Sequence, residues 1–339
     1  MSSILITGVA IRGISAVVPS KVLTNDQIGG ITNRDYVNKL SQTVGVSERR
    51  TVASNEFGSH LAIEAGRLLL SQLLWETSSI DLLVVATQTP DRLFPGVSFM
   101  VHKELGLSAA CTVLDLNLGC SAFTHGLWVV STLLKSLGRR AILINVDTMS
   151  KTIGPNDFGN QVLFGDAGTA TAVEIDPSTN PIHIITMSDG HGTESVCLPN
   201  SGMSATQEKS AFFVINGPAV LGLALRTVPK LVESLLKNSN LEPSDIGTFV
   251  PHQANRFILE KLSSRLQIPL DRTVIGMQQF GNTSSASIPL ALCAMQDQVN
   301  KLDRRFSLLM GFGTGFSLSG VIADLSLTKF DGVHTLREN

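Results

Sequence analysis

Residues 112–138, TVLDLNLGCSAFTHGLWVVSTLLKSLG, contain a change of hydrophobic period on which the predicted fold rests. The run opens with apolar and β-branched residues from Thr112 onward, which is typical of a strand. After Gly119 the apolar residues recur every three or four positions, which predicts a helix. These residues are Phe123, Leu127, Val130, Leu133, Leu134 and Leu137. Cys120 is therefore expected at a turn between a strand and a helix.

The expected position of Cys120 favours a reactive thiol. The amide N–H groups of a first helical turn have no partners within the helix, and the helix dipole is positive at this end. Such a position can lower a cysteine pKa from about 8.5 to about 4–7, so that the thiolate forms at neutral pH. A second interpretation is a small buried apolar residue, because most free cysteines are structural. This stretch alone leaves both interpretations open.

Length and composition indicate a globular protein with more than one small core. A chain of 339 residues fits two α/β halves of about 150 residues each. Hydrophobic residues make up 43% of the chain, and the formal net charge is −2. This charge offers no electrostatic argument for binding nucleic acid or an anionic membrane.

The sequence predicts neither export nor membrane insertion. The first residues lack the basic segment of a signal peptide, and no run of 18 or more apolar residues occurs. The cysteines show neither metal-ligand spacing nor a disulfide framework. They are Cys111, Cys120, Cys197 and Cys293. We therefore expect a cytoplasmic protein with reduced thiols and no metal site.

Hydrophobic periodicity outlines several other elements. It predicts helices over residues 34–43 and 58–74 and a buried strand over 82–86. Residues 48–50, Glu-Arg-Arg, and residues 156–163 are expected in loops.

The second half of the chain repeats the pattern of the first. Three segments have counterparts in the same order, at offsets of about 166, 162 and 165 residues. The pairs are 78–91 with 244–255, 113–131 with 274–292, and 139–148 with 304–313. The duplication places Cys120 and Asn282 at equivalent turns, and His252 directly after a strand. Because α/β sheets form sites at the carboxyl ends of their strands, these three residues are expected to converge.

Each second-half residue also has a structural interpretation. A single histidine is usually a packed or exposed side chain, and Asn282 suits a helix N-cap. The glycine-rich run at 311–315, GFGTG, matches neither a dinucleotide-binding fingerprint nor a phosphate-binding loop. A tight turn that exposes backbone N–H groups to a site suits this run better.

Together these residues resemble the thiolase-fold condensing enzymes, most closely the β-ketoacyl-acyl carrier protein synthase III group. The similar segments are the Cys120 turn, VPHQAN (250–255), FGNTSSAS (280–287), GFGTGFS (311–317), INGPAV (215–220) and FGDAG (164–168). The resemblance implies an α/β thiolase fold with two pseudo-symmetric halves in an α-β-α-β-α layering. We expect the halves to be residues 1–175 and 176–339.

The resemblance also implies a reaction. Cys120 would attack an acyl thioester, with the oxyanion held by backbone N–H groups of Cys120 and Thr314. His252 and Asn282 would then stabilise the enolate formed as a malonyl-type thioester loses CO₂, giving a β-ketoacyl product in fatty acid or polyketide assembly. No cofactor is implied, since coenzyme A and acyl carrier protein thioesters are substrates. Asn255 and Gly313 are expected among the substrate contacts.

The segment expected to hold the donor departs from the family pattern. Familiar members use an aromatic residue and two arginines to hold coenzyme A, and the corresponding positions here are Lys39, Thr43 and Phe158. Losing such stacking removes about 1–3 kcal/mol of binding. The donor is therefore expected either on acyl carrier protein or as a coenzyme A ester held by other contacts, such as Tyr36 and Lys39.

Further expectations concern partners and alternatives. Phe94 matches a family position that reaches across a homodimer interface into the partner's acyl pocket. The glycine-rich run lacks the second cysteine of thiolases, and Thr87-Gln88-Thr89 lacks the glutamate of enzymes that make hydroxymethylglutaryl thioesters. Two other functions stay open from sequence: acyl transfer to an alcohol or amine without decarboxylation, and a catalytically silent subunit that shapes an active partner.

Overall fold

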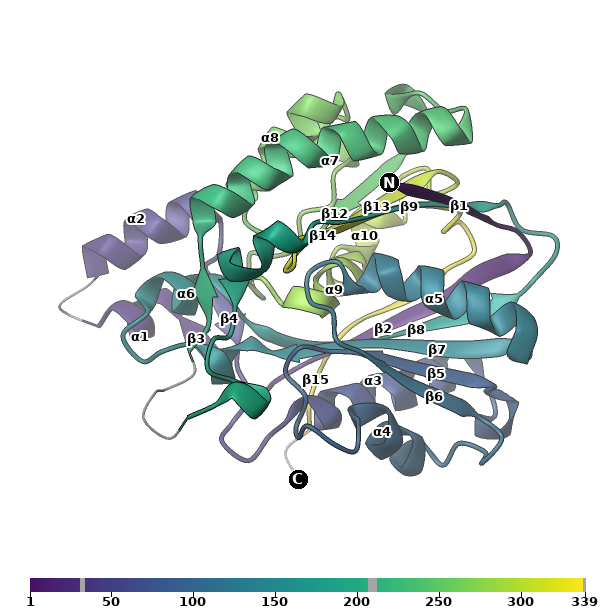
Figure 1. The fold of residues 1–339 in the computed structure, drawn as a ribbon, viewed down its shortest axis with the longest axis horizontal. Coiled ribbons are helices and arrows are strands. Elements are labelled where there is room, and N and C mark those ends of the chain that lie inside the picture. Colours follow the sequence, from purple (N-terminus) through teal and green to yellow (C-terminus); the bar gives the residue numbers. More distant parts are fainter. Residues whose placement is uncertain (31–33, 207–211, 338–339) are drawn as a thin grey trace.

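The structure is a computed structural model that describes residues 1–30, 34–206 and 212–337. It has five layers, with two sheets separated by a pair of helices and covered on their outer faces by further helices (Figure 1). This arrangement confirms the predicted layered thiolase-like architecture.

Each sheet has a defined strand order. The first contains β1 (Ser2–Ile6), β9 (Ile182–Ser188), β14 (Ser317–Ala323), β13 (Ser307–Gly313) and β12 (Thr248–Pro251). The second contains β15 (Lys329–Thr335), β2 (Val9–Val18), β8 (Asp166–Ile175), β7 (Arg140–Thr148), β5 (Leu82–Ala86) and β6 (Thr112–Leu116). Two short pairs complete the strands: β3 (Val22–Thr24) with β4 (Glu48–Arg50), and β10 (Val196–Cys197) with β11 (Val214–Ile215).

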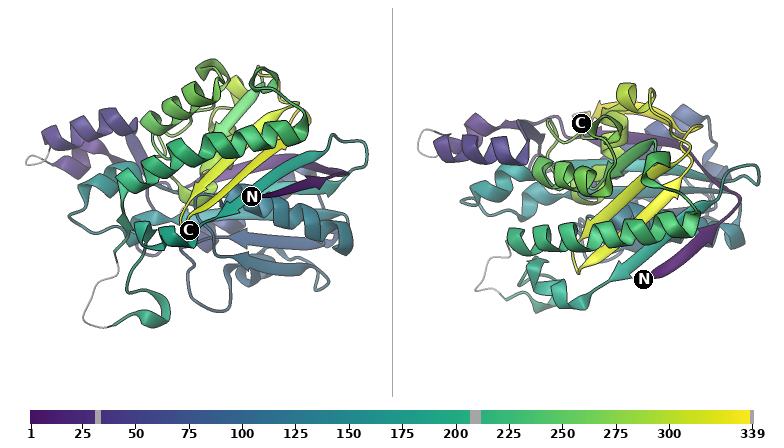
Figure 2. Two further views of the ribbon diagram at one scale, coloured as in Figure 1. Left: turned by 45° about the horizontal axis from the view of Figure 1, so that its top comes forward. Right: turned by 90° about the horizontal axis from the view of Figure 1, so that it is seen from above.

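The helices fall into a middle layer and two outer layers. The middle layer holds α5 (Ala122–Leu137) and α9 (Ser287–Ala294). The outer helices are α3 (Gly58–Leu73) and α4 (Val97–Leu105) on one side, and α7 (Gly217–Ser239) and α8 (Arg256–Leu266) on the other. The remaining helices are α1 (Asn25–Gly29), α2 (Arg34–Val44), α6 (Phe158–Leu163) and α10 (Gln296–Val299). Figure 2 shows α7 lying along the outer face of the β13–β14 sheet.

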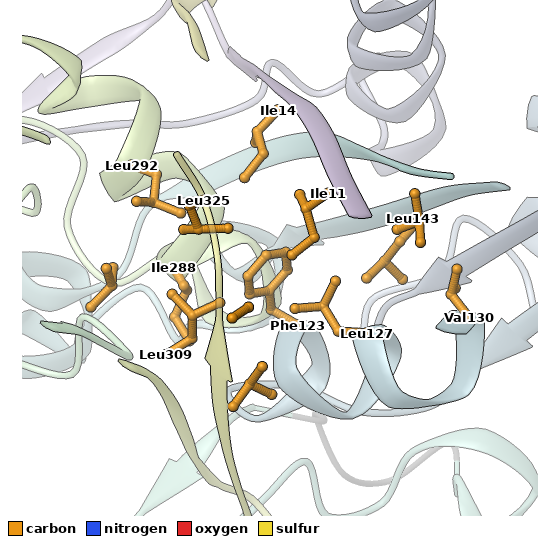
Figure 3. Packing of buried hydrophobic residues seen from close by; sticks show 14 of the residues in the cluster. Ile11, Ile14, Phe123, Leu127, Val130, Leu143, Ile288, Leu292, Leu309 and Leu325 are labelled. Carbon is orange, nitrogen blue, oxygen red and sulfur yellow. The ribbon is translucent and has the colours of Figure 1, made fainter. Parts of the chain in front are cut away.

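The main core lies between the two sheets, around α5 and α9. Apolar side chains of α5 meet those of both sheets there, and Figure 3 shows Phe123 and Leu127 among Ile11, Ile288 and Leu309. Such burial contributes about 1.5–3 kcal/mol per large apolar side chain. The core therefore holds the first turn of α5, and with it Cys120, at the seam between the halves.

The strand order supports the internal duplication. In the second sheet, β8 pairs antiparallel with both β2 and β7, and β7 then pairs in parallel with β5 and β5 with β6. In the first sheet, β9, β14 and β13 repeat the antiparallel steps, and β13 pairs in parallel with β12. A parallel bridge from Phe249 to Thr273 stands where β6 stands in the other sheet. Cys120 and Asn282 therefore follow equivalent parts of the two sheets.

The terminal strands cross the predicted boundary at residues 175/176. β1 pairs with β9 in the sheet of the C-terminal half, and β15 pairs with β2 in the sheet of the N-terminal half. Each half therefore supplies an edge strand to the sheet of the other.

Two segments expected as loops form regular structure. Residues 156–163 include the short helix α6, and Glu48–Arg50 form β4, which pairs with β3. Arg49 is 0% exposed, and its guanidinium donates to the carbonyl oxygens of Leu23 and Val162. These bonds give two of the buried guanidinium nitrogens acceptors that lie far away in the chain, which explains why the loop prediction at residues 48–50 was wrong. Burial also lowers the pKa of Arg49 to about 10.

The other helix and strand predictions agree with the structure within a residue or two. The predicted helices are α2 and α3, and the predicted strand is β5. Within the described part of the chain, every helix is too short or too polar to cross a bilayer.

Candidate active site

Cys120 lies in the turn between β6 and α5, and Ser121 is the N-cap of the helix. This turn packs against the end of β13. A Cβ built on Gly313 would lie 2.5 Å from the Cβ of Cys120 and 3.1 Å from its Sγ. Because only glycine permits this approach, Gly313 lets the C-terminal half reach the thiol.

His252 follows β12 directly and is buried. Its backbone N–H donates to the Met310 carbonyl of β13 at 2.7 Å, and its ring packs edge-to-face on Phe312. Nδ1 lies 2.7 Å from the hydroxyl oxygen of Ser287, the first residue of α9. Burial lowers the pKa of His252 to about 3, so the imidazole is neutral near pH 7.

Asn282 is held by the backbone of the segment that precedes β8. Its N–H donates to the Leu163 carbonyl at 2.8 Å, and its own carbonyl accepts from the Gly165 N–H at 3.1 Å. Its side-chain Oδ1 accepts from the Ser284 N–H at 2.9 Å. The amide orientation is therefore set, with Nδ2 directed toward His252.

Asn282 and His252 form a pair of neutral donors. Nδ2 of Asn282 lies 3.5 Å from Nε2 of His252. When the Ser287 hydroxyl donates to Nδ1, the ring carries its proton on Nε2. Two N–H donors at this separation do not satisfy each other, but one oxygen acceptor between them can receive both bonds. The pair is thus arranged to bind a carbonyl oxygen or an enolate.

A cavity of about 160 Å³ brings six of the predicted site residues together. These are Cys120, His252, Asn255, Asn282, Gly313 and Thr314. The rest of its wall is mostly apolar, with Leu163, Phe164, Val196, Phe213, Ile215 and Val220. A thiol, a donor pair and an apolar wall in one cavity suit an acyl group held next to a developing negative charge.

The thiol of Cys120 differs from the sequence-based expectation. Burial raises the pKa of Cys120 to about 12 instead of lowering it, although the residue as a whole is only partly buried. The carboxylate of Asp147 adds to this rise, whereas a hydrogen bond with the Ser284 hydroxyl opposes it. The resting free form is therefore the thiol.

Asp147 was missed in the sequence, although it lies near the end of the buried strand β7. Its carboxylate is buried and accepts hydrogen bonds from the backbone N–H groups of Gln88 and Ser285, at 2.9 and 3.1 Å. The hydroxyls of Thr87 and Thr89 also donate to it. Asp147 thus ties the loop after β5 to the loop that carries Asn282. Its place at a strand carboxyl end was the signal that could have identified it.

A larger cavity of about 500 Å³ adjoins the first. The two share a wall formed by Gln88, Met149, Val196, Phe213 and Thr314. The Cys120 cavity therefore has space next to it that the sequence did not predict.

Four predicted substrate contacts lie outside the lining of the Cys120 cavity. Tyr36, 58% exposed, and Lys39 lie on α2, whose C-terminal end adjoins Arg256 at the start of α8. Phe158 begins α6 and packs against the core cluster beneath α7 and α8. Phe94 is 81% exposed and projects from its own subunit.

Acidification is expected to destabilise the fold through His252. The pKa of about 3 in the folded state lies below the ordinary value of 6.5, so between these pH values the unfolded chain binds a proton that the folded chain does not. From this residue alone, the unfolding free energy should fall by about 1.4 kcal/mol for each pH unit below about 6.5. Urea denaturation of the wild type and of His252→Asn between pH 7 and about 4.5 measures the difference.

Asp166 acts in the opposite direction and provides an internal check. Burial raises its pKa to about 6, so it stabilises the fold as pH falls through that value in both proteins. The contribution of His252 is therefore the difference between the two pH profiles. Equal slopes for wild type and variant would contradict the buried, neutral imidazole.

Comparison with known proteins identifies the family. Residues 114–190 match the family described as 3-oxoacyl-(acyl-carrier-protein) synthase III, and residues 236–325 match its C-terminal part. A β-ketoacyl-(acyl-carrier-protein) synthase III of Alkalilimnicola ehrlichii is 34% identical, over 91% of this chain and 96% of the relative. Synthase III 2 of Bacillus cereus is 32% identical, over 94% and 98%.

The solved structures agree with the sequence relatives. A crystal structure of a 3-oxoacyl-(acyl-carrier-protein) synthase from Burkholderia xenovorans superposes with a TM-score of 0.93 at 31% identity. The match covers 98% of this chain and 99% of that one. The priming β-ketosynthase of the R1128 polyketide pathway gives a TM-score of 0.83 at 25% identity, over 94% and 97%. On this evidence the chain belongs to the β-ketoacyl-acyl carrier protein synthase III family of thiolase-fold condensing enzymes.

Proposed function

We propose that this acyltransferase catalyses a decarboxylative Claisen condensation through an acyl-Cys120 intermediate. The observation that carries the proposal is the shared cavity, in which the Cys120 thiol lies beside a donor pair made by His252 and Asn282. A nucleophile and an enolate-binding pair are the two parts that such a reaction needs.

In the first half-reaction, the sulfur of Cys120 attacks the carbonyl carbon of an acyl thioester. Backbone N–H groups of Cys120 and Thr314 hold the oxyanion, the carrier leaves as a thiol, and an acyl-enzyme remains. Because the pKa of Cys120 is raised to about 12 in the free enzyme, the thiol loses its proton as its sulfur attacks, and that proton ends on the sulfur of the departing carrier.

In the second half-reaction, a malonyl-type thioester places its carbonyl oxygen between Nε2 of His252 and Nδ2 of Asn282. The carbon–carbon bond to the carboxylate breaks and CO₂ leaves. The electron pair of the broken bond forms the enolate. The enolate carbon then attacks the acyl-Cys120 carbonyl, and the sulfur departs from the β-ketoacyl product. In a cavity shielded from water, each donor contributes about 2–4 kcal/mol of barrier lowering. Asn282 suits this task because its amide donates without titrating.

The deciding experiment follows both half-reactions on the intact chain. The protein is first treated with a panel of acyl thioesters and weighed by mass spectrometry, and malonyl-acyl carrier protein is then added. Release of CO₂ with a β-ketoacyl product supports the condensation. Ester or amide formation with an added alcohol or amine would favour simple acyl transfer. A chain that never gains acyl mass would favour the silent subunit.

We further propose that acyl carrier protein delivers the acyl donor, and that no cofactor is needed. Lys39 and Thr43 are exposed on α2, and Phe158 packs among apolar neighbours, so these positions offer no aromatic and arginine clamp for an adenine. The same acyl group should acylate Cys120 with a kcat/KM at least about tenfold higher when acyl carrier protein carries it than when coenzyme A carries it. Micromolar affinity for acetyl-coenzyme A would contradict this proposal.

A homodimer is proposed from exposed apolar groups around β6. Among the described residues this edge strand pairs with β5 alone, and its Leu114 is 37% exposed. Phe94 is 81% exposed, and Leu93 and Phe99 are also exposed. Apolar edge strands are commonly covered by a partner, here a second copy of the chain. The four free cysteines suit a cytoplasmic location.

Light scattering should therefore give about twice the 36.2 kDa chain mass. Leu114→Lys places a charge at the centre of the proposed interface and should shift the protein toward the monomer. Lys39→Ala, on the distant helix α2, should leave the mass unchanged. A wild-type monomer at micromolar concentration would contradict the dimer.

A further inference from the structure

Gln88 lies in the wall between the Cys120 cavity and the larger cavity, and it lines both. It follows the end of β5 by two residues, and its backbone N–H donates to Asp147 at 2.9 Å. The side-chain Oε1 accepts from the Thr314 hydroxyl at 3.2 Å. Gln88 is thus fixed at both its backbone and its amide oxygen.

The amide also lies close to the nucleophile. A Cβ built on Gly119 would lie 2.3 Å from Oε1 of Gln88, so the amide packs directly on the residue before Cys120. Among the described residues, no hydrogen bond uses Nε2 of Gln88. The amide N–H₂ group of this side chain, which lines the Cys120 cavity, is therefore left without an acceptor in the described part of the protein.

An acyl chain on Cys120 that extends toward the larger cavity passes this amide. A purely alkyl group would remove water from Nε2 and leave its N–H groups without an acceptor, which is unfavourable. An oxygen on the acyl chain would receive the bond instead. The lining of the larger cavity mixes apolar side chains with polar ones, and the polar ones include Thr89, Asn117, Ser188, Asp189, Thr193 and Ser201.

We propose that Gln88 selects an acyl group that carries a hydroxyl close to the thioester, with 3-hydroxyacyl donors preferred over alkyl donors. The proposal rests on the function proposed above, because it concerns the group held on Cys120. A hydroxyl on the third carbon accepts from Nε2 and directs the remainder of the chain into the larger cavity. Gln88 is then a residue that determines specificity.

The test compares two donors of nearly the same shape on the same acyl carrier protein: 3-hydroxybutyryl, in each enantiomer, and 3-methylbutyryl. The rate of Cys120 acylation is followed by intact mass. One enantiomer should react at least about tenfold faster than 3-methylbutyryl, which corresponds to one neutral hydrogen bond. Gln88→Leu should abolish this preference while 3-methylbutyryl reacts at an unchanged or higher rate. Met149→Leu, which alters an apolar residue of the same wall, should preserve the ratio.

Three outcomes would overturn the inference alone. Equal rates for the two donors in the wild type would show that Gln88 selects no hydroxyl. If Gln88→Leu lowered the acylation rate equally for both donors, the role of Gln88 would be to support Thr314 and not to select the acyl group. Acylation by alkyl donors of the panel but by neither test donor would overturn the inference and leave the condensation standing. Failure of every donor to acylate the chain would instead overturn the proposed function, and the inference with it.

Discussion

Cys120→Ala will gain no acyl mass from any thioester and will lower condensation by a factor on the order of 10⁴ or more. The reason is that both half-reactions use the Cys120 sulfur. It is the nucleophile that forms the acyl-enzyme in the first step and the group that departs from the product in the second. The fold should persist, because alanine fits the space of the cysteine and the Gly313 contact remains possible. Intact mass spectrometry after a donor pulse measures the loss directly.

Cys197→Ala is the matched control. Cys197 lines the larger cavity and is also a free thiol, but it does not line the cavity that holds the donor pair. Its variant should be acylated like the wild type. Acyl mass on Cys120→Ala, or its loss in Cys197→Ala, would assign the nucleophile to another residue.

The same Cys120→Ala protein should still release CO₂ from malonyl-acyl carrier protein. His252 and Asn282 are unchanged in it, and the enolate they stabilise can take a proton when no acyl group is present. Complete loss of CO₂ release would indicate that decarboxylation depends on the acyl-enzyme.

His252→Ala and Asn282→Ala will each retain acylation of Cys120 and lose condensation by about 10²- to 10³-fold. Each variant removes one of the two donors that meet at the enolate oxygen, with Nε2 and Nδ2 only 3.5 Å apart in the wild type. Single-turnover measurements separate the steps: acyl mass reports the first half-reaction, and CO₂ and product report the second. The double variant should cost less than the product of the single effects, since both donors bind one atom.

Asn282→Asp tests the donor role of Asn282 more specifically than Asn282→Ala does. It keeps the size of the side chain and the acceptor for the Ser284 N–H, but it places a carboxylate oxygen where the enolate needs a donor. Condensation should fall at least as far as in Asn282→Ala. Parallel loss of acylation and condensation in all three variants would contradict the division of roles.

Several features of this site could be predicted from sequence because they depend on local pattern and on the repeat. The change of period at Gly119 placed Cys120 at a strand-to-helix turn, and the structure has α5 beginning two residues later. From the duplication alone, Asn282 and His252 could be predicted to lie near Cys120 at the carboxyl ends of the strands. Such predictions succeed because the direction of each strand determines where its carboxyl end lies.

Other features depend on residues that are distant in the chain. The pKa of Cys120 is raised by burial of the thiol and by the carboxylate of Asp147 on β7, so its helix-terminal position alone misled the prediction. Arg49 lies in a strand because its guanidinium finds carbonyl oxygens at Leu23 and Val162. In the sequence, Gln88 is an ordinary loop residue. Only the folded structure shows that its amide oxygen accepts a hydrogen bond from the Thr314 hydroxyl.

The pattern of this chain therefore predicted the repeated α/β halves and placed Cys120, His252 and Asn282 at the turns and strand ends where they meet, because hydrophobic period and order along the chain are properties of sequence. Folding determined the exchange of β1 and β15 between the sheets, the neutral forms of Cys120 and His252, and the contact between Gln88 and Thr314. These features depend on burial and on contacts between segments that are separated in the chain, which exist only once the two sheets have packed around α5 and α9.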